Sequence, residues 1–395
     1  MKHFFPPLIE VRLSCAKMMK IVSVEPTPSP NSMKLNLDEK LPVGVSHNYT
    51  PENKRKAPDY IQRLLEIPGV KGVFQVMDFI ALERNPKADW RDILAQARGV
   101  LGATDEYARE EVSPVKEDAF GEVQVFVQMF RGLPMQIKLE AGGEQKRVGL
   151  PERFMKAAME AQSASQNLVM ERKWEDRGVR YGTMEEIGEE VAQEIAAAYD
   201  EERLRQLVAQ AFVQKEGEGP KEEALSGAAV EGMLDDPDWE KRFAALERMN
   251  PTAEDIPVLH KALHDTKTSI RRLAVVYLGM IESKQVLPLL FEALKDKSPV
   301  VRRTAGDTLS DLGDPAAIGP MTEALKDSNK LVRWRAARFL YEVGDETALP
   351  ALRLAQDDPE FEVSLQVKMA LERIEGGEAA SGTVWQQMTR SRKET

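Results

Sequence analysis

The sequence is poor in the side chains that build disulfide frameworks and thiolate metal sites. Its 395 residues include a single cysteine, Cys15, and four histidines. One cysteine cannot close an intrachain disulfide and cannot supply the several thiolates of a structural zinc or iron–sulfur site. The sequence also has no run of 18 apolar residues, so it predicts no membrane-spanning helix and no membrane partner.

Signatures of catalysis are missing as well. The sequence has no phosphate-binding loop, no GxGxxG fingerprint and no GxSxG elbow, and Cys15 has no histidine close to it in the sequence. We therefore expect a protein that is not an enzyme and that holds no cofactor.

The charge of the chain points away from nucleic acid. The net charge is −11, and the first 105 residues carry 15 Lys and Arg against 12 Asp and Glu, so the negative charge lies in the rest. An acidic body disfavours nucleic acid and anionic lipid as main partners. Other proteins are the partners that the composition leaves.

A repeat of 31 residues occupies the C-terminal part. Its copies begin at Asp265, Asp296 and Asp327, and a fourth begins at Asp358 without the arginine of the others. Matching positions carry the same kinds of residue: Ile270, Val301, Val332 and Val363; Ala274, Ala305 and Ala336; Leu278, Leu309 and Leu340. The apolar residues recur at i, i+4 and i+8, which predicts one buried helix stripe per copy. A period of this length indicates stacked helical units.

These phased copies resemble HEAT repeats, of the short kind also found in phycobilin lyases, over residues 224–375. The resemblance implies an all-α solenoid that binds other macromolecules. By analogy with the lyases it also admits, as a weaker alternative, a lyase-like enzyme.

The N-terminal part alternates short strands and helices. Strands are predicted at Ile21–Val24, Met33–Leu37 and within Val70–Glu83, and helices at Ala57–Ile67 and from Asp89 to Val100. The proline-rich loop between the first two strands contains three candidate partner-binding residues, Thr27, Asn31 and Ser32. A rigid loop presents a preformed docking surface, although it can equally serve only to fix the connection between strands.

This order of elements resembles the N-terminal domain of the Nfu/NifU iron–sulfur scaffold proteins over residues 19–105. In that family a separate domain with a Cys-x-x-Cys pair holds the cluster, and this chain has no such pair. The resemblance therefore implies an α/β docking domain. It also suggests, as an alternative function, an accessory factor in iron–sulfur delivery that binds client proteins without holding a cluster.

Residues 106–214 form a middle α+β domain. Alternating segments at Glu122–Phe130 and Met135–Ala141 predict a β-hairpin, and helices are predicted at Pro151–Met170 and Thr183–Phe212. The polar stretch 215–223 reads as a linker. We expect residues 1–18 to be a non-native or disordered extension and residues 376–395 to be a disordered tail.

The three parts together resemble the conserved virulence factor C family of Bacillota, which implies a bacterial cytoplasmic protein. The predicted fold class is a multidomain α+β protein followed by an all-α HEAT-like solenoid.

Two sets of repeat residues are candidates for function or structure. Arg271, Arg302 and Arg333 share one phase, and we expect each to pair with the aspartate of its own turn, which is Asp265, Asp296 or Asp327. An anion-binding groove is the alternative. Arg272, Arg303, Trp334 and Arg338 lie just off the buried stripe and are candidates for binding a partner, with Trp334 either exposed as a hot spot or half-buried against the next repeat.

His260 and His264 lie four residues apart on a predicted helix, so both rings could reach one metal ion. The residue after the first histidine is Lys261 where a zinc protease needs glutamate, and the later repeats carry Lys295 and Lys326 at the position of His264. We therefore predict a solvated surface and no metal site. The acidic run Glu185, Glu186, Glu189, Glu190 and Glu194 is also predicted to be a solvated helix face.

The favoured hypothesis is an adaptor whose N-terminal domain holds one partner protein and whose solenoid holds another.

Overall fold

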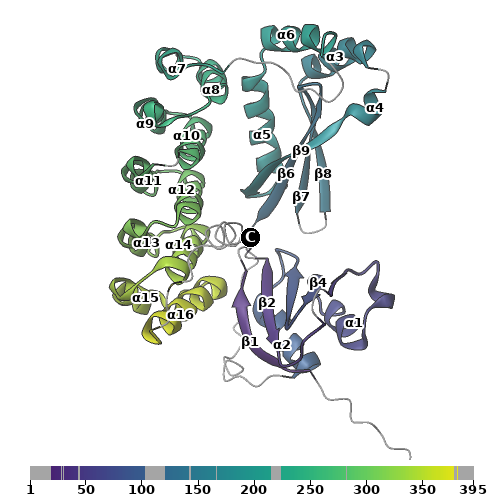
Figure 1. Ribbon diagram of the computed structural model, residues 1–395, viewed down its shortest axis with the longest axis vertical. Coiled ribbons are helices and arrows are strands. Elements are labelled where there is room, and N and C mark those ends of the chain that lie inside the picture. The colour runs from purple at the N-terminus through teal and green to yellow at the C-terminus, as the bar shows by residue number, and fades with distance from the viewer. Residues whose placement is uncertain are drawn as a thin grey trace, which may run out of the picture. The chain divides into compact units, whose positions relative to one another are not determined.

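The computed structural model describes residues 19–27, 29, 31–42, 45–102, 121–141, 144–165, 167–214, 224–281, 283–377 and 380. Three expected features, the extension at 1–18, the linker at 215–223 and nearly all of the tail at 376–395, lie outside these residues. The chain divides into two compact units, residues 1–116 and 117–395, and each is described by itself (Figure 1). Among the described residues no helix is both long enough and apolar enough to cross a membrane.

Over its described residues, the first unit is an antiparallel five-stranded sheet with two α-helices. The strand order is β1-β2-β5-β4-β3. In chain order the elements are β1 (Ile21–Pro26), β2 (Ser32–Leu37), β3 (Ser46–Tyr49), η1 (Lys54–Lys56), α1 (Asp59–Leu65), β4 (Val70–Val76), β5 (Phe79–Arg84) and α2 (Trp90–Leu101).

The core of this unit follows from the sequence pattern. Alternate residues of β2 are buried, among them Leu35, and they share the core with Trp90 and Ile93 of α2. Asp89 caps α2 as predicted, because its carboxylate accepts a hydrogen bond from the main-chain N–H of Arg91. The two strands expected within Val70–Glu83 are β4 and β5, whereas β3 was not predicted.

The second unit begins with an antiparallel four-stranded sheet in the order β8-β7-β6-β9. Its elements are β6 (Glu122–Phe130), β7 (Leu133–Ala141), β8 (Glu144–Gly149), α3 (Glu152–Ala161), η3 (Gln162–Ala164), α4 (Leu168–Glu171), β9 (Lys173–Tyr181), α5 (Met184–Ala198) and α6 (Glu201–Ala211). The predicted hairpin is confirmed. Its turn is Arg131-Gly132, with φ of 48° and 85°, the left-handed backbone of a two-residue hairpin loop.

Two helix predictions in this domain are wrong in extent. The helix expected over Pro151–Met170 ends at Ala161, and α4 starts separately behind the cap residue Asn167. The helix expected over Thr183–Phe212 breaks after α5, because the side chain of Asp200 accepts from the main-chain N–H of Arg203 and starts α6. Strand β9 was not predicted. It is an edge strand rich in charged residues, a composition that conceals the alternating pattern.

The rest of the second unit is a solenoid of helix pairs, as the repeats predict. Figure 1 shows the helices in two columns, with α8, α10, α12 and α14 on the side toward α5. The helices are α7 (Gly227–Met233), α8 (Trp239–Glu247), α9 (Ile256–Leu263), α10 (Thr268–Met280), α11 (Leu287–Ala293), α12 (Pro299–Leu312), α13 (Ile318–Ala324), α14 (Lys330–Val343), α15 (Leu349–Ala355) and α16 (Phe361–Glu375), with 3₁₀ turns η4 (Ala253–Asp255), η5 (Lys284–Val286), η6 (Pro315–Ala317) and η7 (Glu346–Ala348).

The predicted stripe is the core of the solenoid. Ile270, Ala274 and Leu278 of α10 are fully buried, and so are their equivalents in α12. The small alanines let α10 and α12 pack closely, so neighbouring repeats share one continuous apolar core.

Candidate functional site

The phased arginines join neighbouring repeats. Arg271 donates from Nε and Nη2 to both carboxylate oxygens of Asp296, at 2.7 and 3.0 Å, and from Nη1 to the main-chain carbonyl of Asp265, at 2.9 Å. The expectation that each arginine pairs with the carboxylate of its own turn is therefore wrong, since it binds the carbonyl of its own turn and the carboxylate of the next one. The same double contact recurs in two further sets: Arg302 with Asp327 and the carbonyl of Asp296, and Arg333 with Asp358 and the carbonyl of Asp327.

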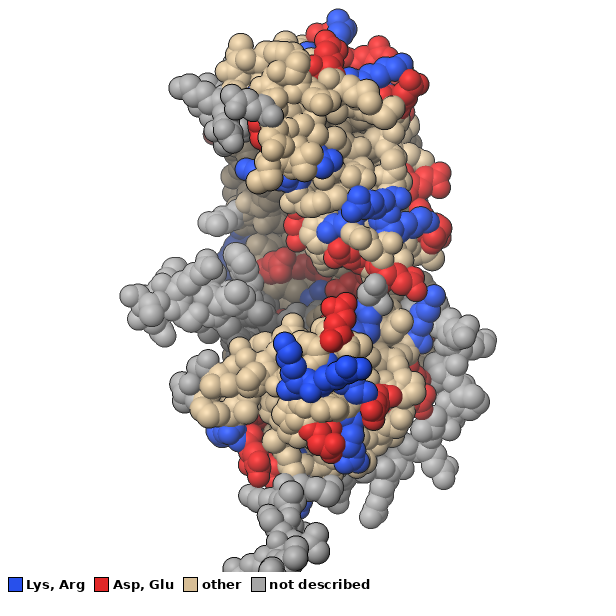
Figure 2. Space-filling view, turned by 90° about the vertical axis from the view of Figure 1, so that its right-hand side faces the viewer, with Lys and Arg blue, Asp and Glu red and all other residues tan. Residues whose placement is uncertain are grey.

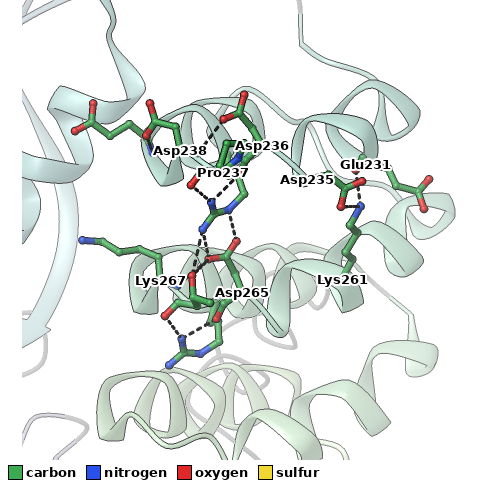
Figure 3. Close-up of polar contacts among 12 residues, drawn as sticks. Glu231, Asp235, Asp236, Pro237, Asp238, Lys261, Asp265 and Lys267 are labelled. Carbon is green, nitrogen blue, oxygen red and sulfur yellow. Dashed lines mark hydrogen bonds and ion pairs between the residues drawn. The ribbon is translucent and has the colours of Figure 1, made fainter.

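The ladder starts one repeat earlier than the sequence suggested. Arg242 holds the carboxylate of Asp265 at 2.7 and 2.9 Å and the carbonyl of Asp236 at 2.8 Å, so it belongs to the same series. Figure 3 labels Asp236 and Asp265, the two partners in these contacts. Each carboxylate also accepts the main-chain N–H two residues on, as Asp265 does from Lys267. The ladder is a structural clamp that leaves its arginines already paired, which argues against an anion groove.

These contacts perturb the ionisation of the aspartates. Burial acts to raise the pKa of Asp265, but hydrogen bonds from Arg242 and from the N–H of Lys267 outweigh it and leave this pKa below its ordinary value. The pKa of Asp296 is lowered in the same way by Arg271. Both carboxylates are therefore held in the charged form that the arginines need.

Two of the candidate partner-binding residues contact the chain's own middle domain. Arg272 of α10 lies 3.4 Å from the carboxylate of Glu194 on α5, and Arg180 of β9 holds the same carboxylate at 2.6 Å. Glu194 is 7% exposed, so the expectation of a solvated acidic face is wrong for this residue. Burial acts to raise the pKa of Glu194, and the charges of Arg272 and Arg180 more than offset it, so the carboxylate stays ionised between two guanidinium groups.

Arg303 makes the second contact with the middle domain. Its Nη2 donates to the hydroxyl of Tyr181, at the end of β9, at 2.9 Å, and its guanidinium carbon lies 4.6 Å from the centre of the Tyr181 ring. The same guanidinium also lies 3.2 Å from the Asp307 carboxylate and 5.5 Å from the centre of the Trp334 ring. Helices α10 and α12, which form part of the column toward α5, thus use Arg272 and Arg303 to hold the middle domain of the same chain. We call this side of the repeats the inner face and the opposite side the outer face.

Trp334 and Arg338 do not present the exposed surface that a hot spot requires. Trp334 is 1% exposed, and Arg303 and Arg335 lie over its ring. Arg338 is 6% exposed and its Nε binds the carboxylate of Glu342 at 2.7 Å. Of the two interpretations of Trp334, the exposed one is wrong, and burial is more complete than the half-buried alternative allowed.

The proline-rich loop of the first unit is held by its own polar side chains. The hydroxyl of Thr27 donates to the carbonyls of Ser29 and Ser32 at 3.1 and 3.0 Å. Asn31 is 7% exposed, and its side-chain oxygen accepts from Arg84 at 3.4 Å. Thr27 and Asn31 thus serve the connection between strands, which leaves the role of Thr27, Asn31 and Ser32 in partner binding a prediction.

The two histidines have a third neighbour that the sequence analysis missed. Glu292 of α11 places its carboxylate oxygens 3.4 Å from Nε2 of His260 and 3.0 Å from Nε2 of His264. All three side chains are exposed, as expected for a solvated surface. Glu292 lies 31 residues after Lys261, the residue that follows His260, so the repeat period itself carried the signal that could have found it.

An exposed apolar surface lies on the helices of the middle domain. Helix α3 packs on α6, and Arg131 binds both the Glu171 carboxylate of α4 and the Ala211 carbonyl of α6. Large apolar side chains around these contacts are exposed: Met155, Met159, Val169, Met170, Phe212 and Val213. We call this set the methionine surface. Figure 2 shows a broad area with few charged side chains near the top of the molecule, at the height where Figure 1 places α3, α4 and α6.

Three protein families match successive parts of the chain. Residues 22–106 match the N-terminal family of the scaffold proteins Nfu/NifU, residues 128–208 match a family described as virulence factor, and three overlapping segments between 226 and 372 match HEAT repeats. The virulence-factor match covers the strands and helices that carry both Glu194 and most of the methionine surface.

Relatives align over nearly the whole chain. An uncharacterised protein of Bacillus subtilis, YpgR, is 62% identical over 95% of this chain and 99% of its own length. Conserved virulence factor C of Staphylococcus aureus (strain MRSA252) is 48% identical over 94% of this chain and 99% of its own length. Among solved structures, protein SAV1430 of Staphylococcus aureus is 36% identical over 20% of this chain and 96% of its own, with a TM-score of 0.20.

Proposed function

Because the chain belongs to the conserved virulence factor C family, we propose that it is a non-enzymatic adaptor that binds other proteins in the bacterial cytoplasm. In this proposal the N-terminal unit holds one partner and the second unit holds another. HEAT repeats are stacked helical units whose extended surfaces commonly serve protein binding.

The methionine surface is the observation that carries the proposal. Met170 is 77% exposed and Val213 is 82% exposed, although both are large apolar side chains. Large exposed apolar side chains that gather on one surface mark interaction sites, and the six of the methionine surface come from α3, α4 and the residues directly after α6. Methionine is unbranched and polarizable, so it adapts to partner surfaces of different shape.

The inner face of the repeats has a different role in this proposal. Arg272 and Arg303 already hold the middle domain, so a partner that used them would have to displace Glu194 and Tyr181. We therefore place the partner site of the second unit on the methionine surface. The arginines of the inner face keep the middle domain attached to the repeats.

Paired charge-introducing variants test this proposal. The double variant Met159→Glu/Met170→Glu places carboxylates on the methionine surface, and Met280→Glu places one on an exposed methionine of α10 as a matched control. In-cell crosslinking of the full chain is expected to lose a defined set of proteins in the double variant only. The same proteins crosslinked to all three chains would reject the methionine surface as the partner site.

A second candidate function is favoured by the Nfu/NifU match over residues 22–106. In this version the chain is an accessory factor in iron–sulfur delivery, and its N-terminal unit docks iron–sulfur client proteins. The single cysteine means that it acts on clients without ligating a cluster. Reduced aconitase-type activity in a deletion strain, restored by the full chain, is the expected result, and unchanged activity would reject it.

A further inference from the structure

Three side chains of the kinds that bind metals converge on the outer face of the repeats, in the column of helices away from α5 (Figure 1). They are His260, His264 and Glu292. The two histidines belong to α9 and its C-terminal cap, and Glu292 belongs to α11 of the next repeat. One ligand atom from each side chain lies within 4.8 Å of the others, and within the described part of the chain they form the one group of three such residues close enough to share an ion. Neither histidine takes part in the arginine ladder or in the contact with the middle domain.

Two of the three separations are close to those between ligands of a tetrahedral zinc ion. Zinc bonds to imidazole nitrogen and carboxylate oxygen of about 2.0–2.2 Å place neighbouring ligand atoms about 3.3–3.5 Å apart. The carboxylate oxygens of Glu292 lie 3.4 Å from Nε2 of His260 and 3.0 Å from Nε2 of His264. The ligand atoms of the three side chains lie within 4.8 Å of one another, so they can converge on one ion when the side chains rotate.

The hydrogen bonding of His264 prepares it to bind a metal. Its Nδ1 lies 3.0 Å from the main-chain carbonyl oxygen of His260, and because a carbonyl only accepts, Nδ1 must donate. Nε2 faces the Glu292 carboxylate, which also only accepts, so this nitrogen donates a proton in the ion-free contact and must release that proton to bind a metal. Metal-binding histidines are commonly oriented by this kind of second hydrogen bond.

The nearest lysine in the sequence is turned away from the cluster. Lys261, between the two histidines, binds the Asp235 carboxylate at 2.7 Å and the Glu231 carbonyl at 2.8 Å in the preceding repeat (Figure 3). Its positive charge is thereby partly compensated and directed to the other side of α9. The net charge of the three side chains with neutral imidazoles is −1, which suits a divalent cation.

We propose that His260, His264 and Glu292 bind a divalent transition metal ion of the zinc type on the outer face of the solenoid. Two imidazoles and one carboxylate are the donor set that suits such ions, and hard oxygen-seeking ions such as Mg²⁺ are disfavoured. The ion clips α9 to α11 of the next repeat. Three protein ligands leave one coordination position for water or for a donor from a bound partner.

Zinc titration of the chelator-treated full chain tests this site. Isothermal titration calorimetry with ZnCl₂ is expected to show one ion per chain with a Kd of about 10 µM or tighter. Both His264→Ala and Glu292→Gln are expected to weaken binding at least tenfold, to judge from the roughly 10- to 100-fold losses common at metal sites. Because these side chains are exposed, the variants are expected to fold.

Two further measurements separate the site from other zinc ligands in the chain. The control His47→Ala removes an exposed histidine of the first unit, and Cys15→Ser removes the only thiol. Both controls should bind zinc like the parent chain, and zinc should raise the Tm of the parent and of both controls but not of Glu292→Gln. Millimolar binding only, or binding that Glu292→Gln leaves unchanged, would overturn the proposal.

Discussion

Arg271 binds the carboxylate of Asp296, one repeat ahead, while it holds its own turn through the main-chain carbonyls of Asp265 and Thr266. Each arginine therefore links two neighbouring repeats. A pairing with the aspartate of its own turn would not have connected the repeats. In a solenoid, stability depends on the contacts between neighbours as well as on each repeat. The ladder supplies a polar contact of this kind at each junction from Arg242 to Asp358.

Removing one member of the ladder is expected to destabilise the solenoid strongly. In Asp296→Ala the guanidinium of Arg271, whose side chain is 3% exposed, loses its carboxylate partner. Breaking a buried pair from one side costs about 3–5 kcal/mol. Urea unfolding of the variant measures this loss.

The matched control is an exposed pair on the same solenoid. Glu323 and Lys326 have side chains 72% and 62% exposed, so Glu323→Ala is expected to change stability by less than about 0.5 kcal/mol.

A double-mutant cycle tests which aspartate Arg271 pairs with. The coupling free energy of Arg271 with Asp296 should be larger than that with Asp265. Equal coupling to both aspartates would contradict the pairing between repeats.

The ladder also makes stability depend on pH. Because the folded-state pKa values of Asp265 and Asp296 lie below their unfolded values, these groups stabilise the fold fully only above the unfolded pKa of about 3.9. This contribution is lost as the pH falls through the folded pKa values. The urea midpoint measured from pH 7 to pH 3 should therefore fall less steeply in Asp296→Asn than in the parent, and identical slopes would count against the claim.

The middle domain is expected to loosen when Glu194 is removed. Glu194→Ala leaves Arg180 and Arg272 facing each other without the carboxylate between them, at a cost of about 3–5 kcal/mol. Hydrogen exchange should become faster in α5 and α10 together. Glu189→Ala, an exposed residue of the same helix, is the control that should change neither helix. Faster exchange confined to α5 would contradict a contact shared with the repeats.

Trp334 is expected to contribute to the stability of the fold and not to partner binding. Trp334→Ala removes a fully buried indole and should cost about 3–5 kcal/mol. Partners crosslinked to the full chain should be unchanged wherever the variant is still folded. Selective loss of a partner from a folded, equally stable variant would restore the hot-spot interpretation.

The period of the repeats predicted the core of the solenoid but not its polar contacts. Ile270, Val301 and Val332 are buried as expected, because apolar phase alone decides which side of a helix is covered. The apolar phase did not decide which carboxylate pairs with Arg271. Asp265 and Asp296 share one phase, and only the stacking of the repeats determines which carboxylate the guanidinium reaches.

The contact between the middle domain and the repeats was beyond prediction from the repeat pattern. Glu194 and Tyr181 come from a part of the chain without repeats, so nothing in the phase of Arg272 or Arg303 indicates them. The acidic run concealed Glu194 among glutamates that are exposed or only partly buried. Helix breaks such as that at Asp200 were readable in principle, since aspartate favours the cap position, but its neighbours are also compatible with a continuous helix.

The most direct test of the adaptor function compares the partners of the two units. Residues 1–116 and 117–395 are expressed separately, which keeps the contact of Glu194 with Arg272 intact, and crosslinked partners are compared with those of the full chain. The adaptor proposal predicts two different sets of proteins, one for each unit, both recovered by the full chain. Recovery of every partner by one unit alone would contradict it.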